Sequence, residues 1–516
     1  MSNVHHRFAF ASVAVAFVLA LFALYWFGVL GARVNTETVL SDESASEQEV
    51  IVADESNNKT TLFGTMLAFN TNEGLRGLSN GPEMLMSGWS TILADKNSLA
   101  RFLLELTRAL EENAVLTAET GFSSNRDVVG AFVWNVIEPT KGEYDWSITD
   151  ATLEAAGKAD VTLSAVIQPF ASWDQTVDPE VYKDTCQAID FGYFDFMASP
   201  VSDWDSYENF LTATVERYDG DGVNDMPSLK TRVASWEIGN EYDGSCGGYF
   251  ENPEGYAELL RRSYQVIKQA DPQALVLNAG ALEIVGFGNG PNETRAFWQD
   301  FFDAGADAYL DAFNLHYNRE RNGADDSPDA WIEHLVFFND LMDGSDGRKP
   351  MWVTEFGTYS GTPNSSSPPG QPVSSGRTLP TQSAEFQSAW FFRYAVIGFS
   401  QGVERIFIDL EGSENNGIGA SSLFNQGGRG KDGVPRAFMA TLQEMGVTLD
   451  GFSAVEELGE GQYVFSVNGK NVYALWEGST PKDLSGSIHE VGIDGKEKIV
   501  DASTLRFSSS APILAW

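Results

Sequence analysis

The stretch "VASWEIGNEYDG" (residues 233–244) runs from an apolar segment directly into polar and acidic residues. A short apolar run of this kind is typical of a strand that is buried on both faces, as strands of parallel sheets are. Three carboxylates lie within or just after the run, at Glu237, Glu241 and Asp243. The rest of the chain indicates which of them has a chemical role.

Seven further apolar runs of the same type occur in the region 61–445. They are "LFGTMLAF" (62–69), "VVGAFVW" (128–134), "VTLSAVI" (161–167), "ALVLNAG" (274–280), "DAFNLH" (311–316), "PMWVTEF" (350–356) and "ERIFIDL" (404–410). Stretches with helical periodicity separate most of them. Eight buried strands that alternate with helices predict an α/β fold, a (β/α)₈ TIM barrel. An open doubly wound sheet is the alternative, but no Gly-rich phosphate loop follows the first strand.

Residues 446–516 have a different pattern. Apolar and polar residues alternate with period two around the turn dipeptides Asn468-Gly469 and Asp494-Gly495. This pattern is typical of antiparallel hairpins. It predicts a small C-terminal β-domain, sandwich-like, packed on the barrel.

The N-terminus predicts membrane targeting. Residues 8–32 carry no charge and are long enough to span a bilayer as a helix, with Arg7 on the N-terminal side. Residues 1–33 are therefore predicted to be a signal anchor, with a cleaved signal peptide as the alternative. The acidic, Ser-rich segment 34–60 is typical of a flexible stalk. The body of the protein is predicted to be extracytoplasmic, either membrane-anchored or secreted.

The charge balance narrows the class of partner. The chain has 33 basic and 73 acidic residues, a formal net charge of −40. Such a surface repels phosphate, which argues against nucleic acid and against anionic membrane surfaces. It favours neutral ligands. The two cysteines, Cys186 and Cys246, form one disulfide or are two separate thiols.

No metal or cofactor is predicted. The segment "DGDGVND" (Asp219–Asp225) spaces oxygens like a calcium loop but lacks the distal glutamate of an EF-hand. An acidic turn is the preferred interpretation, and a calcium site is the alternative.

Catalytic groups of a (β/α)₈ barrel lie at the carboxyl ends of its strands. The fourth predicted strand ends in Asn240-Glu241, the sixth in His316-Tyr317 and the seventh in Glu355. Two carboxyl groups that face each other about 5–5.5 Å apart are what double-displacement glycoside hydrolysis requires. One carboxyl donates a proton to the leaving oxygen, and the other attacks the anomeric carbon.

Several motifs resemble those of clan A glycoside hydrolases, which are retaining (β/α)₈ enzymes, and families 5 and 39 are the most similar. "WEIGNE" (236–241) resembles the strand-four signature, and "WVTEFG" (352–357) resembles the strand-seven signature. "FVWNVIEPTKGEYDWSITD" (132–150) is similar to the element at strand two, and "AVIQPFASWDQ" (165–175) is similar to the end of strand three. These elements occur in the order found in the clan.

The resemblance implies roles for residues at three of the strand ends. Glu241 matches the acid/base, Glu355 the nucleophile, and Asn240 the residue that binds the sugar 2-hydroxyl. His316 matches the histidine that lines the site. Tyr317 is a candidate to approach the nucleophile, although the clan places its tyrosine two residues after the histidine.

Arg126 follows Gly121 with the clan's G-x(4)-R spacing. The resemblance implies that Arg126 keeps the nucleophile ionised through a charge-assisted hydrogen bond. A surface arginine is the alternative interpretation. Glu237, inside the strand, is expected to belong to a buried polar network rather than to transfer protons.

The chain departs from the clan at strand eight, where a tryptophan usually forms the floor of the sugar subsite. Here Asp409 and Glu411 lie near that position. Another aromatic ring is expected to stack on the sugar, because the C–H faces of sugars pack on aromatic rings. The candidates are Trp173, Trp134, Trp352 and Tyr242, with a place in the core as the alternative. The Gly-, Ser- and Pro-rich segment 358–381 is expected to overhang the cleft.

These patterns predict a retaining glycoside hydrolase that acts on β-linked carbohydrate. The alternative is a barrel of the same fold that binds carbohydrate without hydrolysing it. The sequence does not name the sugar.

Overall fold

The computed structural model describes residues 60–67, 114–115, 117–118, 121–127, 131–177, 199–244, 248–249, 252–282, 291–318, 327–345, 347–358, 360, 382–409 and 437–516. The predictions for residues 1–59, Cys186, Cys246, Glu411 and most of the segment 358–381 lie outside these residues. Within the described ranges, no helix combines the length and the apolar character that a bilayer span requires.

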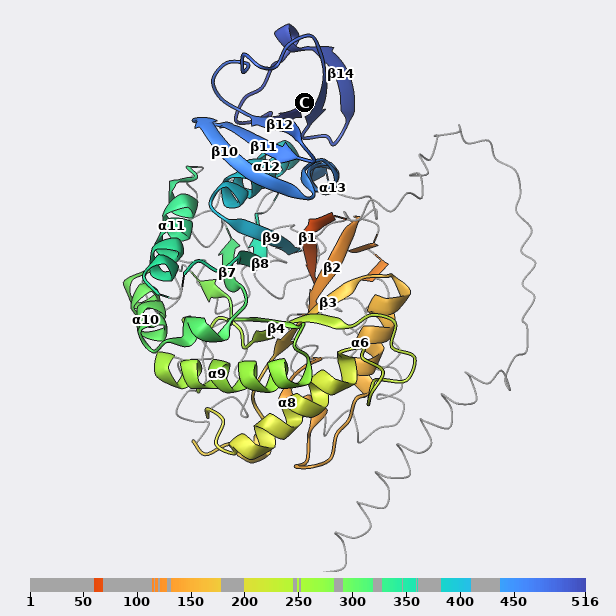
Figure 1. The fold of residues 1–516 in the computed structure, drawn as a ribbon, viewed down its shortest axis with the longest axis vertical. Coiled ribbons are helices and arrows are strands. Elements are labelled where there is room, and N and C mark those ends of the chain that lie inside the picture. The colour runs from red at the N-terminus through yellow and green to blue at the C-terminus, as the bar shows by residue number, and fades with distance from the viewer. Residues whose placement is uncertain are drawn as a thin grey trace, which may run out of the picture.

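A parallel sheet forms the centre of the molecule (Figure 1). Its order is β5-β4-β3-β2-β1-β9-β8-β7-β6. Its strands are β1 (Thr60–Leu67), β2 (Phe122–Asp127), β3 (Thr162–Ile167), β4 (Val233–Ile238), β5 (Leu275–Leu277), β6 (Ala281–Leu282), β7 (Phe313–Asn318), β8 (Met351–Gly357) and β9 (Val403–Asp409). β5 and β6 are two parts of one strand position, so the sheet has eight positions, as a (β/α)₈ barrel requires.

The barrel closes at the break between β5 and β6. β5 pairs with β4, β6 pairs with β7, and Leu277 bridges to Ala312. The buried Asn278 replaces the missing ladder bonds with its side chain. Its Nδ2 donates to the Asn314 carbonyl over 2.7 Å, and its Oδ1 accepts from the Asn314 amide over 2.6 Å. The amide side chain therefore continues the pairing where the strand is interrupted.

The predicted second strand, residues 128–134, is wrong. The strand is β2, Phe122–Asp127, and residues 134–137 form the short helix α5 (Trp134–Ile137). β2 (FSSNRD) is largely polar, and its Arg126 belongs to the network described below. The described part of the apolar run, residues 131–134, is buried outside the sheet, where Phe132 packs edge-on against Trp236 with ring centroids 5.5 Å apart. Apolar character alone therefore selected the wrong segment.

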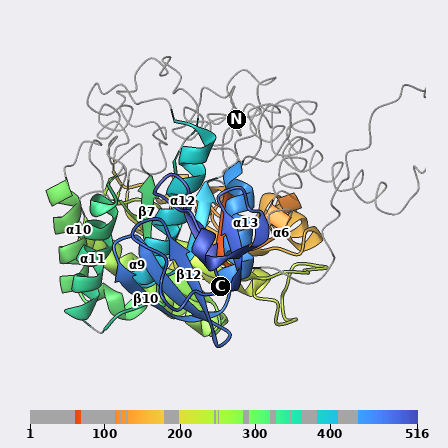
Figure 2. The same cartoon turned by 90° about the horizontal axis from the view of Figure 1, so that it is seen from above.

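Helices surround the sheet on its outer side. They are α6 (Ser147–Lys158), α8 (Trp204–Tyr218), α9 (Pro253–Ala270), α10 (Pro291–Asp303), α11 (Asp329–Asp343) and α12 (Ala384–Ser400). Seen from above, α10 and α11 lie on one side of the barrel and α6 lies on the opposite side (Figure 2). Asn252 caps the start of α9: its side chain accepts a hydrogen bond from the Gly255 amide, and a proline follows it, both typical of a helix start.

The C-terminal residues form one six-stranded antiparallel sheet, as predicted, but not a sandwich. Its order is β10-β11-β12-β15-β13-β14. The strands are β10 (Phe452–Gly459), β11 (Gln462–Val467), β12 (Lys470–Leu475), β13 (Ser487–Gly492), β14 (Glu497–Asp501) and β15 (Ile513–Ala515), and the helix α13 (Ala437–Leu449) precedes them. One face packs on α12, where Phe399 and Phe465 are in contact. The other face is covered by Leu484 and Leu505 from the sheet's own connections rather than by a second sheet. α12 is buried almost all round because it lies between barrel and sheet (Figure 1).

Candidate active site

Two glutamates lie together at the carboxyl ends of β4 and β8. Glu241 follows the end of β4 by three residues, and Glu355 lies within β8. They are 3% and 6% exposed. An oxygen of each carboxylate and a ring nitrogen of His316 lie within 4.8 Å of one another. The structure therefore brings together three residues that the sequence separates by up to 114 positions.

The turn after β4 is held in an unusual backbone conformation. Gly239 has φ 85° and Glu241 has φ 54°, both in the left-handed region that disfavours a glutamate. The Gly239 amide donates to the Ile167 carbonyl over 2.8 Å, and the Glu241 amide donates to the Ala279 carbonyl. A Cβ on Gly239 would meet the Tyr242 ring at 2.1 Å. Hydrogen bonds to neighbouring strands therefore hold strained backbone at the site, as is common where function needs it.

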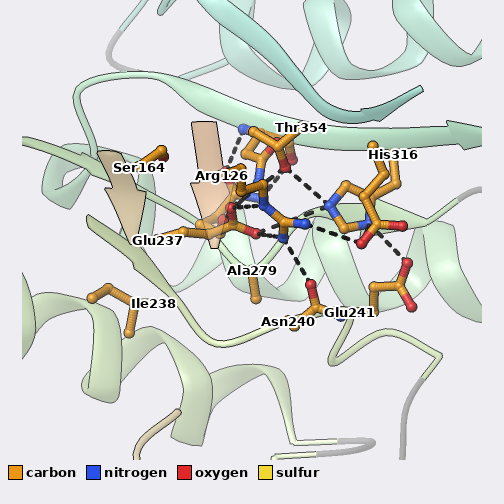
Figure 3. Close-up of polar contacts among 12 residues, drawn as sticks. Arg126, Ser164, Glu237, Ile238, Asn240, Glu241, Ala279, His316 and Thr354 are labelled. Carbon is orange, nitrogen blue, oxygen red and sulfur yellow. Dashed lines mark hydrogen bonds and ion pairs between the residues drawn. The ribbon is translucent and has the colours of Figure 1, made fainter. Parts of the chain in front are cut away.

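Arg126 lies on β2 and connects both halves of the site (Figure 3). It forms two parallel hydrogen bonds with Glu237, Nε to Oε2 over 2.8 Å and Nη2 to Oε1 over 2.6 Å. Its Nη1 donates to Glu355 Oε1 over 3.0 Å, and its Nη2 donates to Asn240 Oδ1 over 2.8 Å. Arg126 is fully buried. The interpretation of Arg126 as a surface residue is therefore wrong.

Glu237 and Arg126 compensate each other's charge. Burial lowers the pKa of Arg126, but the Glu237 and Glu355 carboxylates raise it more, so the guanidinium stays charged. Burial raises the pKa of Glu237, and the ion pair with Arg126 opposes that rise. A carboxylate in this position needs such a partner, because an unpaired buried charge costs several kcal/mol (~3–5). Glu237 thus lies in the buried polar network expected for it.

His316 lies on β7 between the two glutamates. Its Nδ1 is 2.7 Å from Glu241 Oε1, and its Nε2 is 3.0 Å from Thr354 Oγ1. Gly280, with φ 61°, makes room for the ring, because a Cβ there would meet Nε2 at 2.2 Å. The sequence analysis did not predict a role for Thr354. Its position next to Glu355 in the sequence was the one feature that could have indicated a place in the site.

Tyr317 lies outside the site, contrary to prediction. Its ring packs against Trp331 of α11 at 4.4 Å between centroids and against Trp390 of α12. Successive side chains of a strand point to opposite faces. Because His316 faces the barrel interior, Tyr317 faces the helices.

Three of the four candidate sugar platforms are core residues. Trp134 is fully buried and stacks on Phe210 at 5.6 Å, so its proposed contact with the sugar is wrong. Trp352 fills the barrel interior beside Phe407, and Tyr242 packs against other tyrosines. Trp173 follows β3 in a short 3₁₀ turn and is only half-buried. Its Nε1 donates to the Glu138 carbonyl over 2.8 Å, which fixes the ring orientation.

The acidic turn Asp219–Asp225 satisfies its own backbone. The Gly220 and Gly222 amides donate to Asp225 over 3.1 and 2.8 Å, and the Asp221 amide donates to Asp219 over 3.1 Å. Burial raises the pKa of Asp219 to about 6. The carboxylates of Asp219, Asp221 and Asp225 lie within 4.8 Å of one another, so the acidic turn stays the preferred interpretation and a calcium site stays the alternative. Glu241, His316 and Glu355 also lie close enough together to ligate a metal ion. The Arg126 cation, which donates to Glu355, would repel a metal ion there.

Asp127, next to Arg126, predicts a pH dependence of stability. Burial raises the pKa of the Asp127 carboxyl from 3.8 to about 7. The folded state therefore favours the protonated form of Asp127. The protonated carboxyl contributes fully to the free energy of unfolding below about pH 4, and this stabilisation is lost as the pH rises to about 7. A shift of about 3 units corresponds to ~4 kcal/mol. We expect Asp127→Asn to be more stable than the wild type at pH 8, with a difference that shrinks at pH 5, in urea unfolding. Equal differences at both pH values would contradict this expectation.

Comparison with known proteins supports the fold. The sequence matches no protein-family model and no curated protein sequence. The structure is similar to a family 39 glycoside hydrolase from Bacteroides cellulosilyticus WH2, at 17% identity, TM-score 0.50, over 80% of this chain and 77% of that one. It is also similar to a family 39 β-xylosidase from Caulobacter crescentus, at 14% identity, TM-score 0.51, over 79% and 91% of the two chains. The predicted resemblance to clan A glycoside hydrolases of family 39 is thus confirmed at the level of the fold.

Proposed function

We propose that this protein is a retaining glycoside hydrolase that cleaves β-linked glycosides by double displacement. The observation that carries the proposal is the pair of buried carboxylates at the barrel mouth, in two different environments. Glu355 accepts a hydrogen bond from the Arg126 cation, whereas Glu241 contacts His316. A cationic donor favours an ionised nucleophile, and a separate environment for the second carboxyl suits an acid.

In the first step, Glu355 attacks the anomeric carbon and forms a glycosyl ester. The glycosidic C–O bond breaks, and Glu241 transfers its proton to the leaving oxygen. In the second step, ionised Glu241 takes a proton from water, the water oxygen attacks the anomeric carbon, and the ester bond to Glu355 breaks. Two inversions give a product with the original β configuration.

Asn240 and Trp173 are the proposed sugar-binding groups. The hydrogen bond from Arg126 to Asn240 Oδ1 orients the Asn240 amide, whose nitrogen is then a donor for the sugar 2-hydroxyl. Trp173 is a candidate platform for a sugar ring because part of its surface is exposed. The net charge of −40 suits an uncharged carbohydrate.

The cellular location remains the one proposed from the sequence. Residues 1–33 have the composition of a membrane anchor or signal peptide, and the acidic segment 34–60 that of a stalk. The catalytic region would then act outside the cytoplasm, where polysaccharide substrates are available.

A binding protein without activity is less well supported. Loss of catalysis normally removes selection on the acid and the nucleophile. Here both glutamates are present, and each has a buried polar partner: Arg126 for Glu355 and His316 for Glu241.

The stereochemistry of the first product tests the proposal. We expect proton NMR, recorded within the first minutes of hydrolysis of an aryl β-glycoside, to show the β anomer before mutarotation. A panel of aryl β-glycosides would identify the sugar. An α anomer as the first product would show inversion and would exclude the double displacement.

A further inference from the structure

A chain of hydrogen bonds connects the buried Glu237 to the proposed acid Glu241 (Figure 3). Thr354 Oγ1 lies 3.4 Å from Glu237 Oε2 and 3.0 Å from His316 Nε2. His316 Nδ1 lies 2.7 Å from Glu241 Oε1. All four residues are at least nine-tenths buried. Water is thus largely excluded, and the protons in this chain can be counted.

The count begins at Glu237. Both of its oxygens accept hydrogen bonds from the Arg126 guanidinium, so the carboxylate is ionised and can only accept. The Thr354 hydroxyl must therefore donate to Glu237. A hydroxyl has a single hydrogen, so towards His316 the same oxygen can only accept. It follows that His316 carries a hydrogen on Nε2.

A neutral histidine with its hydrogen on Nε2 has a lone pair on Nδ1. That lone pair points at Glu241 Oε1, and two acceptors at 2.7 Å repel each other unless a proton lies between them. We propose that Thr354, supported by Glu237, fixes the tautomer of His316, so that the Glu241–His316 hydrogen bond holds the proton that Glu241 donates. This inference rests on the proposed role of Glu241. Thr354 and Glu237 are positioning residues in this scheme.

The same arrangement serves the second step. After the first step the Glu241–His316 pair has given its shared proton to the leaving group, and ionised Glu241 faces the lone pair on His316 Nδ1. This repulsion favours uptake of a proton from the attacking water, which restores the starting pair. Among the described residues, two further carboxylates lie near His316: Glu355, whose Oε1 is 3.7 Å from Nδ1, and Glu237, whose Oε1 is 3.9 Å from Nε2. Arg126 is the cation that compensates both.

Nitrogen-15 NMR of the histidine side chains tests the tautomer directly. The chain has five histidines, and the His316 signals are identified by their loss in His316→Gln. In the wild type at pH 7 we expect the shifts of a ring with a hydrogen on Nε2 and a proton shared at Nδ1. In Thr354→Val, which keeps the shape but lacks the hydroxyl, we expect the hydrogen to move to Nδ1. Thr354→Ser keeps the hydroxyl and should resemble the wild type.

Kinetics with two leaving groups provide an independent readout. 2,4-Dinitrophenolate leaves without a proton, whereas a phenyl β-glycoside needs the acid. We expect Thr354→Val to lower kcat/KM for the phenyl substrate by about 10- to 100-fold and for the dinitrophenyl substrate by less than about 3-fold. The alkaline limb of the phenyl pH profile should move to lower pH, because His316 with a hydrogen on Nδ1 would stabilise ionised Glu241.

Two results would overturn the inference. One is a wild-type His316 whose neutral form carries its hydrogen on Nδ1, and this result requires no variant to fold. The other is an equal loss on both substrates in a folded Thr354→Val. A wild type that hydrolyses no glycoside would contradict the proposed function, whereas the NMR measurement would still decide the tautomer.

Discussion

Replacing Glu355 by alanine should abolish the turnover of an aryl β-glycoside, with a loss on the order of 10⁴-fold or more. Glu355 is the nucleophile of the proposed mechanism, and the methyl group of alanine cannot form the glycosyl ester. The fold should persist, because Arg126 retains its two hydrogen bonds to Glu237. The measurements are initial rates and the thermal unfolding midpoint.

Azide distinguishes the two glutamates. In Glu355→Ala, azide would attack the activated substrate directly and give the α-glycosyl azide by a single inversion. In Glu241→Ala, the ester on Glu355 still forms from a dinitrophenyl glycoside, so azide should give the β-glycosyl azide. The matched control is Glu333→Ala on α11, where the carboxylate is 72% exposed and pairs with Arg295, and its activity should not change. Wild-type rates in Glu355→Ala would exclude Glu355 as the nucleophile.

Removing one partner of the Arg126–Glu237 pair should destabilise the protein by about 3–5 kcal/mol. In Glu237→Leu, the Arg126 cation remains buried with Glu355 as its carboxylate partner. In Arg126→Met, Glu237 remains as a buried charge without its cation. The double variant Arg126→Met/Glu237→Leu should recover a large part of the loss, because two apolar groups then face each other. Urea unfolding of the four proteins gives the coupling free energy.

The surface offers a control with the same geometry. Arg261 donates to Glu258 on α9 through Nε over 2.8 Å and Nη2 over 2.7 Å, but these side chains are 33% and 38% exposed. Arg261→Met should cost no more than about 1 kcal/mol. If the buried single variants cost as little as Arg261→Met, the pair would not be the stabilising centre that we infer.

The sequence predicted the strands best where apolar runs coincide with strands. β3, β4, β7 and β8 lie where expected, because their side chains are buried on both faces of the sheet. β2 was misplaced because it is largely polar and carries Arg126, a charged member of the site. A strand that supplies a functional network loses the apolar pattern by which strands are recognised.

Two wrong site assignments have simple physical reasons. For Tyr317, the alternation of side chains along a strand would have sufficed, given that His316 faces the interior. For Trp134, nothing in the local sequence distinguishes a tryptophan that lines a cleft from one that stacks on Phe210 under a helix. That difference depends on the position of α8, which is distant in the chain.

By itself, the sequence determined the alternation of strands and helices, the antiparallel C-terminal region, and the placement of Glu241 and Glu355 at strand ends. These features depend on local patterns of apolar and polar residues. Only the tertiary structure decided which groups share protons and charge: Arg126 with Glu237 and Glu355, and Thr354 with His316 and Glu241. The physical reason is that hydrogen bonds act over about 3 Å, and closure of the barrel sets which distant residues come within that distance.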